Sequence, residues 1–360
     1  MTAFERFAAG EAMLQVGGCA EAPRVPVRIR GRAGVRGGES VLASEFMAPP
    51  REGFPLLARP APGSATRDRK QWAAGARQLL DRRLEEVGAV LLRGLLLRTP
   101  AEFSELFGAL GYATVAYRGH STRAEVAPGV FTANTRNPGQ SIDLHNDMSQ
   151  EPVMPAQLFL FCAAAPPAGA GGATPIARGA DWKDALGAEL FERFARRGLE
   201  RRTNSPTRGD LHKTGRPWQE RYRTEDPAVA EASCREQGDV VEWLPDGSLS
   251  TRRHVDAVRE HRGETLWCCT PQSTDTASSY EIRYADGEPI EAGVLERLRA
   301  LQWKLSVAFE WQAGDVLCLD NIACQHGRLP LAAGAQRQIL VSLATPQPGT
   351  CRMPVAGSGG

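Results

Sequence analysis

Short apolar runs separated by turn residues dominate the second half of the sequence, and they predict a β-rich core. Residues 157–162 and 316–319 are apolar almost throughout, which is typical of short strands buried on both faces. From Ser306 to Trp311 apolar residues alternate with small or polar ones, and this period of two indicates a strand with one buried face. A further apolar run covers 338–343. We therefore expect an α+β fold whose centre is made of β-strands.

Amphipathic stretches in the first half predict helices that flank this core. Apolar residues at helical spacing indicate a helix over 72–87 that ends at Gly88. Thr99, Pro100 and Glu102 have the arrangement of an N-terminal capping box with proline at the first helical position. Two more helices are expected, over 181–197 and 293–304.

The chain is expected to form one large domain with loosely ordered ends. Residues 1–45 are rich in glycine and arginine and are expected to be loosely ordered, apart from a strand at 25–30. A single domain is expected over 46–350. Within it, residues 200–300 are polar, irregular and rich in arginine, so we interpret them as an insertion between two halves of the β core. Residues 351–360 are expected to form a tail.

Composition argues against several classes of function. The net charge is +1 over 360 residues, so no overall charge attracts nucleic acid or an anionic membrane. No apolar run approaches the length of a membrane span, and the N-terminal residues lack the apolar centre of a signal peptide. Eight cysteines occur without C-x-x-C spacing, which favours free thiols in a reducing cytoplasm over a disulfide framework. We expect a cytoplasmic protein with no nucleic-acid or membrane partner.

The segment 141–149 places a histidine and a carboxylate two residues apart, at His145 and Asp147. Side chains directed into the same cavity would offer one imidazole nitrogen and one carboxylate oxygen to a metal ion. A second histidine from elsewhere in the chain would complete a set of two histidines and one carboxylate. That set leaves coordination positions open and is typical of non-haem Fe(II) oxygenases.

His326 is the candidate for the third ligand, and Arg337 follows it by eleven positions. An arginine fixed on the strand after a metal-binding histidine can hold a carboxylate through two hydrogen bonds. A second H-x-D pair, His254 and Asp256, competes with the first one. His145 follows an apolar stretch and precedes a strand, whereas His254 follows two arginines in a polar segment, so context favours His145 and Asp147.

Several motifs together resemble the taurine dioxygenase-like (TauD/TfdA) superfamily of Fe(II)/2-oxoglutarate oxygenases, in the branch that includes clavaminate synthase and the syringomycin aspartyl hydroxylase. The resemblance covers roughly residues 55–345. It is carried by G-A-V-L-L-R-G, I-D-L-H-N-D-M-S, Q-L-F-L-F-C, G-G-A-T-P-I-A, D-N-x4-H-G-R-x-P and R-Q-I-L-V-S. It implies a double-stranded β-helix (a jelly roll, as in cupins) with flanking helices and a large insertion.

The resemblance also implies roles for individual residues. His145, Asp147 and His326 would bind Fe(II), and Arg337 with Thr174 would bind the 2-oxoglutarate co-substrate, which reacts with O2. No catalytic residue is expected beyond the metal ligands. The remaining candidates are substrate contacts: Asn321, Arg328, Arg118 and Asn134.

The implied function is hydroxylation of an unactivated C–H bond of an amino acid or aminoacyl substrate, in specialised metabolism such as antibiotic biosynthesis. The substrate would be a small molecule, free or tethered to a carrier protein. One alternative is a dioxygenase that desaturates, cyclises or cleaves a small sulfonate or carboxylate. A second alternative is a jelly roll that binds metal without catalysis.

Arginines in two regions could bind an acidic substrate, although surface positions are the more common setting for arginine. Arg118 and Arg123 precede the metal-binding motif, and Arg201, Arg202 and Arg208 lie in the expected insertion. The sequence does not distinguish an anion-binding arginine among them from a solvated one.

Overall fold

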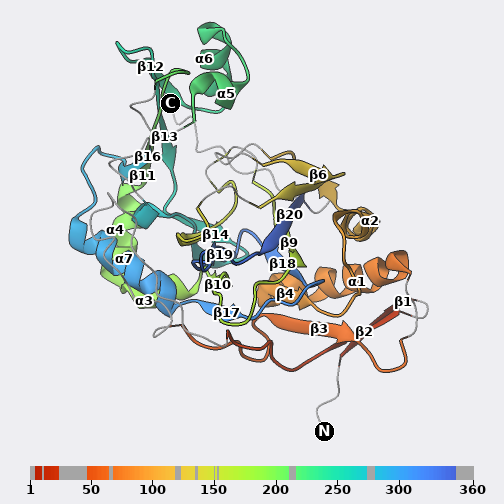
Figure 1. Cartoon of the computed structure of the whole chain (residues 1–360). Helices are drawn as coiled ribbons and strands as arrows, with labels where there is room; N and C mark the ends of the chain where they lie inside the picture. The colour runs from red at the N-terminus through yellow and green to blue at the C-terminus, as the bar shows by residue number, and fades with distance from the viewer. Residues whose placement is uncertain are drawn as a thin grey trace.

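The computed structural model places two β-sheets face to face at the centre of the molecule (Figure 1). It describes residues 5–9, 12–23, 47–64, 68–117, 123–133, 137–149, 151, 154–210, 216–273 and 280–345. The sequence-based expectations for 25–30 and for the tail 351–360 lie outside these residues.

The larger sheet has ten strands, most of them antiparallel. Along the sheet its strands are β1 (Arg6–Ala9), β2 (Ala12–Val16), β3 (Leu56–Pro60), β4 (Ala89–Leu92), β18 (Val316–Asp320), β9 (Gln157–Ala164), β20 (Gln338–Thr345), β7 (Val130–Thr132) and β6 (Glu125–Ala127), and β5 (Ala113–Thr114) pairs with β20. The runs predicted at 157–162, 316–319 and 338–343 are thus neighbouring central strands.

The smaller sheet has four strands and carries the metal-binding motifs. Its order is β17 (Val307–Phe309), β10 (Thr174–Arg178), β19 (Cys324–Arg328) and β8 (Ile142–His145). Apolar side chains from both sheets fill the space between them, including Leu160, Leu319 and Val341 from the larger sheet and Ile176 and Phe309 from the smaller one. This arrangement confirms the predicted double-stranded β-helix within an α+β fold.

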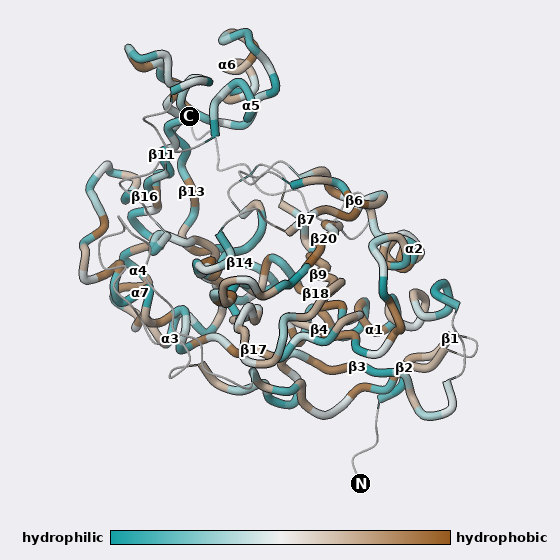
Figure 2. The backbone as a smooth tube through the Cα atoms, in the orientation of Figure 1, coloured by the Kyte–Doolittle hydropathy of each residue, from teal (hydrophilic) through white to brown (hydrophobic). Residues whose placement is uncertain are grey.

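Helices α1 (Arg69–Val87) and α2 (Pro100–Leu110) cover the outer face of the larger sheet (Figure 1). The predicted capping box is present: Thr99 Oγ1 accepts from Glu102 N–H, and the Glu102 carboxylate accepts from Thr99 N–H. Gly88 ends α1 with φ of 78°, as the sequence indicates. In Figure 2, hydrophobic residues gather around the central strands β9 and β18 and around α1. Within the described residues, no helix is both long and apolar enough to cross a membrane.

The N-terminal region differs from the expectation of a loosely ordered segment. β1 and β2 form a hairpin that extends the larger sheet through β3. Phe7 and Leu14 are buried against α1 and its neighbours. In β2 buried and partly exposed residues alternate, but the strand is only five residues long and lies beside glycine- and arginine-rich sequence, so its pattern was not recognised.

Residues 200–300 contain more regular structure than predicted. A separate four-stranded sheet has the order β12 (Val240–Trp243), β13 (Leu249–Val255), β11 (Leu199–Ser205) and β16 (Tyr280–Tyr284). A hairpin of β14 (Val258–His261) and β15 (Glu264–Trp267) follows β13 in the chain. The short 3-10 helix Pro271–Ser273 comes next and precedes β16. The helices of this half are α3 (Asp181–Leu186), α4 (Ala188–Arg197), α5 (Trp218–Tyr222), α6 (Pro227–Glu236) and α7 (Ala292–Lys304).

Polar residues at buried positions explain why these strands were missed. β11 buries Arg201, Thr203 and Ser205, and β13 buries Thr251 and Arg253. In both strands buried positions alternate with partly or fully exposed ones. Polar residues occupy some of the buried positions, so the sequence does not alternate between apolar and polar residues. The predicted helix 181–197 is divided at Gly187 into α3 and α4, whereas the one at 293–304 is confirmed as α7. The division into one domain with an insertion remains a prediction.

The N-terminal hairpin should contribute measurably to stability. Leu14 is 0% exposed, so Leu14→Ala is expected to lower the free energy of unfolding by about 2–4 kcal/mol. Val126→Ala, at a 42% exposed position in β6, should change it by less than about 0.5 kcal/mol. Urea unfolding compares the variants, and equal effects would show that the hairpin does not pack as described.

Candidate metal centre

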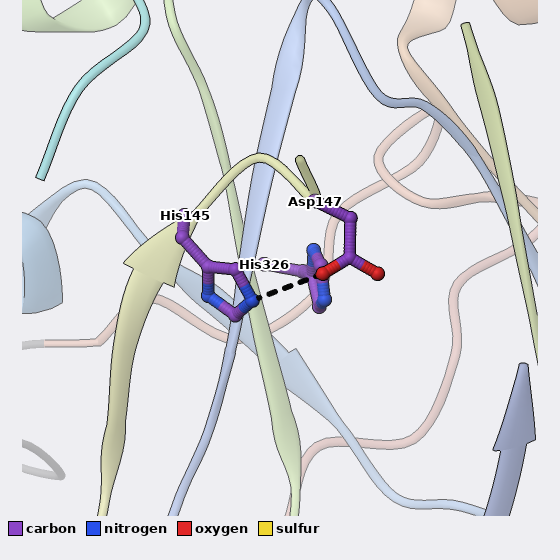
Figure 3. A group of neighbouring side chains, drawn as sticks. All are labelled: His145, Asp147 and His326. Carbon is purple, nitrogen blue, oxygen red and sulfur yellow. Dashed lines mark ion pairs between the residues drawn. The ribbon is translucent and has the colours of Figure 1, made fainter. Parts of the chain in front are cut away.

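Two neighbouring strands bring His145 and His326 together. The residues are paired in the register of β8 and β19, and their ring centroids lie 4.4 Å apart at an interplanar angle of 42°. Asp147 follows β8 and turns its carboxylate toward the imidazoles, with Oδ1 3.5 Å from Nε2 of His145 (Figure 3). One ligand atom from each of the three residues lies within 4.8 Å of those from the other two. The structure thus brings together the three residues that the sequence selects.

The protonation states of this cluster suit a divalent cation. Burial and the neighbouring His145 lower the pKa of His326 to about 3, so its imidazole is neutral. Burial alone would raise the pKa of Asp147, but Arg123 and the two histidines hold it well below its usual range. Nδ1 of His326 is buried and has no hydrogen-bond partner in the described part of the chain. A buried carboxylate beside two imidazoles is the donor set of a two-histidine, one-carboxylate Fe(II) site, so these residues fit the metal.

The backbone of β8 fixes the orientation of His145. Its Nδ1 lies 2.9 Å from the carbonyl oxygen of Asp143. Because a carbonyl oxygen only accepts hydrogen bonds, Nδ1 carries the proton, and the lone pair of Nε2 is left to coordinate a metal ion. Gln302 of α7 supports the free edge of the strand. It accepts from the N–H of Leu144 at 3.0 Å and donates to the carboxylate of Asp143 at 2.9 Å.

Two buried asparagines hold the turn that carries Asp147. Asn321 Oδ1 accepts from the N–H of Asp147 at 2.9 Å, and Asn321 Nδ2 donates to the carbonyl oxygens of Asp147 and Pro155. Asn146 Nδ2 donates to the carbonyl oxygens of Asn321 and Cys324 at 2.7 and 3.1 Å. Asn321 is 0% exposed, and its hydrogen bonds hold the backbone of Asp147. Its predicted contact with the substrate stays a prediction.

Arg337 and Thr174 meet at the start of β10, the strand that pairs with β19 and its His326. Arg337 Nη2 donates to Thr174 Oγ1 at 3.0 Å, and Trp311 Nε1 donates to the same oxygen at 3.0 Å. Burial lowers the pKa of Arg337 to about 10, which leaves it a cation at neutral pH. No carboxylate of the described residues forms an ion pair with it. A guanidinium in this state, with Nε buried and without a hydrogen-bond partner among the described residues, is suited to a carboxylate from a ligand.

The remaining predicted substrate contacts and the competing H-x-D pair lie in different settings. Arg328 is buried, and its Nη2 donates to the backbone carbonyls of Asn137 and Gln140, so it holds a loop. Arg118 and Asn134 lie outside the described residues. His254 and Asp256, the competing pair, have side chains that are 55% and 60% exposed, which agrees with the choice of His145 and Asp147.

Sequence reasoning did not single out Arg123 as a partner of the metal ligand. Its Nη2 lies 3.0 Å from Oδ2 and 3.2 Å from Oδ1 of Asp147, and both side chains are 6% exposed. The two residues are 24 positions apart, and no motif links them, so only the three-dimensional arrangement reveals the contact.

Comparison with known proteins identifies the family. Residues 58–343 match the taurine catabolism dioxygenase TauD, TfdA family. The match covers most of the chain, so the protein belongs to this family, and the predicted resemblance is confirmed. It is an Fe(II)/2-oxoglutarate-dependent dioxygenase that uses O2.

Two similar proteins cover most of the chain. The dapdiamide synthesis protein DdaC of Enterobacter agglomerans is 28% identical over 288 residues, which are 74% of this chain and 85% of DdaC. A clavaminate synthase-like protein of Arabidopsis thaliana is 29% identical over 287 residues, 73% of this chain and 83% of that protein.

Solved structures show a more distant likeness. PvcB from Pseudomonas aeruginosa aligns over 81% of this chain and 85% of its own, with a TM-score of 0.47 and 18% identity. A taurine dioxygenase from Burkholderia xenovorans aligns over 81% and 86%, with a TM-score of 0.46 and 17% identity. The family assignment therefore depends on the sequence match.

The role of Asn321 can be tested by metal binding. Asn321→Ala removes both hydrogen bonds to the backbone of Asp147, so we expect affinity for Fe(II) or Mn(II) to fall about 10–100-fold, as for other residues that orient metal ligands. Anaerobic metal titration measures this, with Asn204→Ala, an exposed asparagine of β11, as the control. Unchanged affinity in Asn321→Ala would contradict the assigned role.

Proposed function

We propose that the protein hydroxylates an unactivated C–H bond of an amino acid or aminoacyl substrate in specialised metabolism. The observation that carries this proposal is the convergence of His145, Asp147 and His326, whose ligand atoms lie within 4.8 Å of one another. Two strands and one turn hold them in place without a bound metal. In this proposal they bind Fe(II), and no other residue takes part directly in the chemistry.

The co-substrate would be held by Arg337, which directly precedes β20, and by Thr174 of β10. Arg337 would form a charge-assisted pair with the distal carboxylate of 2-oxoglutarate, and Thr174 fixes the guanidinium through its hydroxyl oxygen. When bound, Fe(II) and 2-oxoglutarate supply the oxidising chemistry, which consumes O2 and releases succinate and CO2. The protein orients the reactants and limits the access of water, since Asp147 and His326 are buried and the His145 side chain is only 30% exposed.

The carboxylate at position 147 supports oxygenation over halogenation. A metal site without this carboxylate would have a vacant position that a halide could take. Asp147 occupies that position here and is anchored by Asn321. Hydroxylation is the proposed outcome, and desaturation, ring formation or cleavage of a small sulfonate or carboxylate is the alternative.

The substrate class is proposed from the similar proteins. One is named for dapdiamide synthesis and another for its likeness to clavaminate synthase, which supports an amino acid or aminoacyl substrate, free or bound to a carrier protein, more than a sulfonate. A metal-binding protein without catalysis is disfavoured, because the family consists of dioxygenases. We place the reaction in the cytoplasm, which the free state of all seven described cysteines supports.

Succinate release tests the assignment of the metal ligands. Anaerobic reconstitution with Fe(II), followed by 2-oxoglutarate and O2, should give slow uncoupled succinate formation with the wild type. His145→Ala should abolish it, because one of three ligands is lost, whereas His254→Ala at the exposed pair should retain it. Equal loss in the two variants would contradict the choice of ligands, and a wild type that releases none would contradict the proposed activity.

Arg337→Gln should affect the co-substrate and leave the metal in place. Losing a charge-assisted pair costs about 1.5–3 kcal/mol, so we expect the KM for 2-oxoglutarate to rise roughly 10–100-fold with unchanged affinity for Mn(II). Arg59→Gln, at an exposed position in β3, should change neither. The role of Arg337 would be rejected if metal affinity fell while the KM stayed the same.

A further inference from the structure

Arg123 contacts the metal-binding carboxylate with only one of its nitrogens. Nη2 lies within 3.2 Å of both oxygens of Asp147. Nε and Nη1 are buried and have no hydrogen-bond partner in the described part of the chain. Leaving a buried donor without a partner costs about 1–3 kcal/mol. The centre therefore holds two N–H donor groups of a cation that nothing described in the chain satisfies.

Tyr117 fixes the plane of this guanidinium. Cζ of Arg123 lies 3.9 Å from the centroid of the Tyr117 ring, a stacking distance at which the planar group is held against the ring face. Nε and Nη1 donate within that plane, so their directions are set before a ligand arrives. Donors fixed in advance bind an anion at a lower entropic cost than mobile ones.

Charge balance identifies the kind of ligand that is missing. Among the described residues, Asp147 is the carboxylate that pairs with Arg123. In the proposed complex, Fe(II), Arg123 and Arg337 together carry four positive charges, and Asp147 with 2-oxoglutarate carries three negative charges. The two carboxylates of 2-oxoglutarate are already engaged by the metal and by Arg337. An unbalanced buried charge is costly, and one further anionic group would balance it.

We propose that Arg123 binds a carboxylate of the substrate next to the metal, an inference that rests on the proposed function. An amino acid with a free carboxylate supplies this group, whereas an aminoacyl group joined to a carrier protein has lost its α-carboxylate. The inference therefore favours a free small acid, or an aminoacyl group with a side-chain carboxylate, over a carrier-bound substrate without a carboxylate. It also makes Arg123 the residue that sets the distance between the substrate anion and the oxidised carbon.

Acetate serves as the probe, because it carries the carboxylate and little else. The wild type is loaded with Mn(II) and N-oxalylglycine, which stand in for Fe(II) and 2-oxoglutarate, and broadening of the acetate methyl resonance by Mn(II) is measured during titration. We expect saturable binding that is weakened at least ten-fold in Arg123→Gln and less in Arg123→Lys. Acetamide should not bind, and methanesulfonate should bind more weakly than acetate if the site is shaped for a carboxylate.

Arg77→Gln is a matched control. Arg77 also stacks on a tyrosine, with Cζ 3.9 Å from the ring of Tyr112, and also pairs with an aspartate, Asp81. It belongs to α1 on the outer face of the larger sheet, so its loss should leave acetate binding unchanged.

Several outcomes would overturn the inference. They are absence of saturable acetate binding in the wild type, equal binding of acetate and acetamide, and equal affinity in Arg123→Gln and the wild type. Weakened Mn(II) binding in Arg123→Gln, together with wild-type acetate affinity in that variant once it is saturated with Mn(II), would show that Arg123 serves only to orient Asp147. A wild type that fails to bind Mn(II) or N-oxalylglycine would instead contradict the proposed function.

Discussion

The pairing of β8 with β19 is the constraint on which the rest of the centre depends. It places His145 directly opposite His326, and no covalent link or metal is needed to bring the two imidazoles together. β8 is the last strand of its sheet, so only one of its edges is paired. Gln302 binds the N–H of Leu144 on the other edge, which keeps the strand in register where a slip of one residue would turn His145 to the opposite face.

Neutral amides hold the backbone of the remaining ligand, Asp147. Asn146 and Asn321 form hydrogen bonds between the turn after β8 and the loop before β19. Both are buried. Amides can satisfy buried backbone groups without the desolvation cost of an ion, and they add no charge that would compete with a divalent cation for Asp147. The position of the carboxylate is thus set by neutral groups, and its charge is left for the metal and for Arg123.

Sequence alone was sufficient where apolar patterning or a short motif carried the information. The central strands and the capping box at Thr99 depended on local patterns, and the structure confirms both. The choice of His145 over His254 also depended on local context; the structure brings His145 together with Asp147 and His326 and leaves the His254 pair exposed. The N-terminal hairpin and the sheet of β11 and β13 were missed because they are short or because polar residues occupy their buried positions. The contact of Arg123 with Asp147 and the structural role of Asn321 depend on residues far apart in sequence, for which a single sequence has no signal.

The ion pairs of the sheet around β11 bear on which arginine can bind a substrate anion. Arg201 is 1% exposed and lies within 3.7 Å of the carboxylates of Glu151 and Asp239, and Arg253 pairs with the same two residues. Glu151 lies four positions after Asp147, so this network ties the separate sheet to the segment that carries the metal ligand.

Arg202 and Arg208 each pair with a glutamate, Glu200 and Glu225 respectively. A carboxylate ligand would have to displace a protein carboxylate from any of these arginines. Arg123 differs from them, because its carboxylate partner among the described residues is Asp147. A metal ion bound to Asp147 would neutralise part of the negative charge that pairs with Arg123. Binding of the metal would therefore leave the positive charge of Arg123 less well compensated and favour binding of a second anion there. The metal would then bind first and the acidic substrate afterwards.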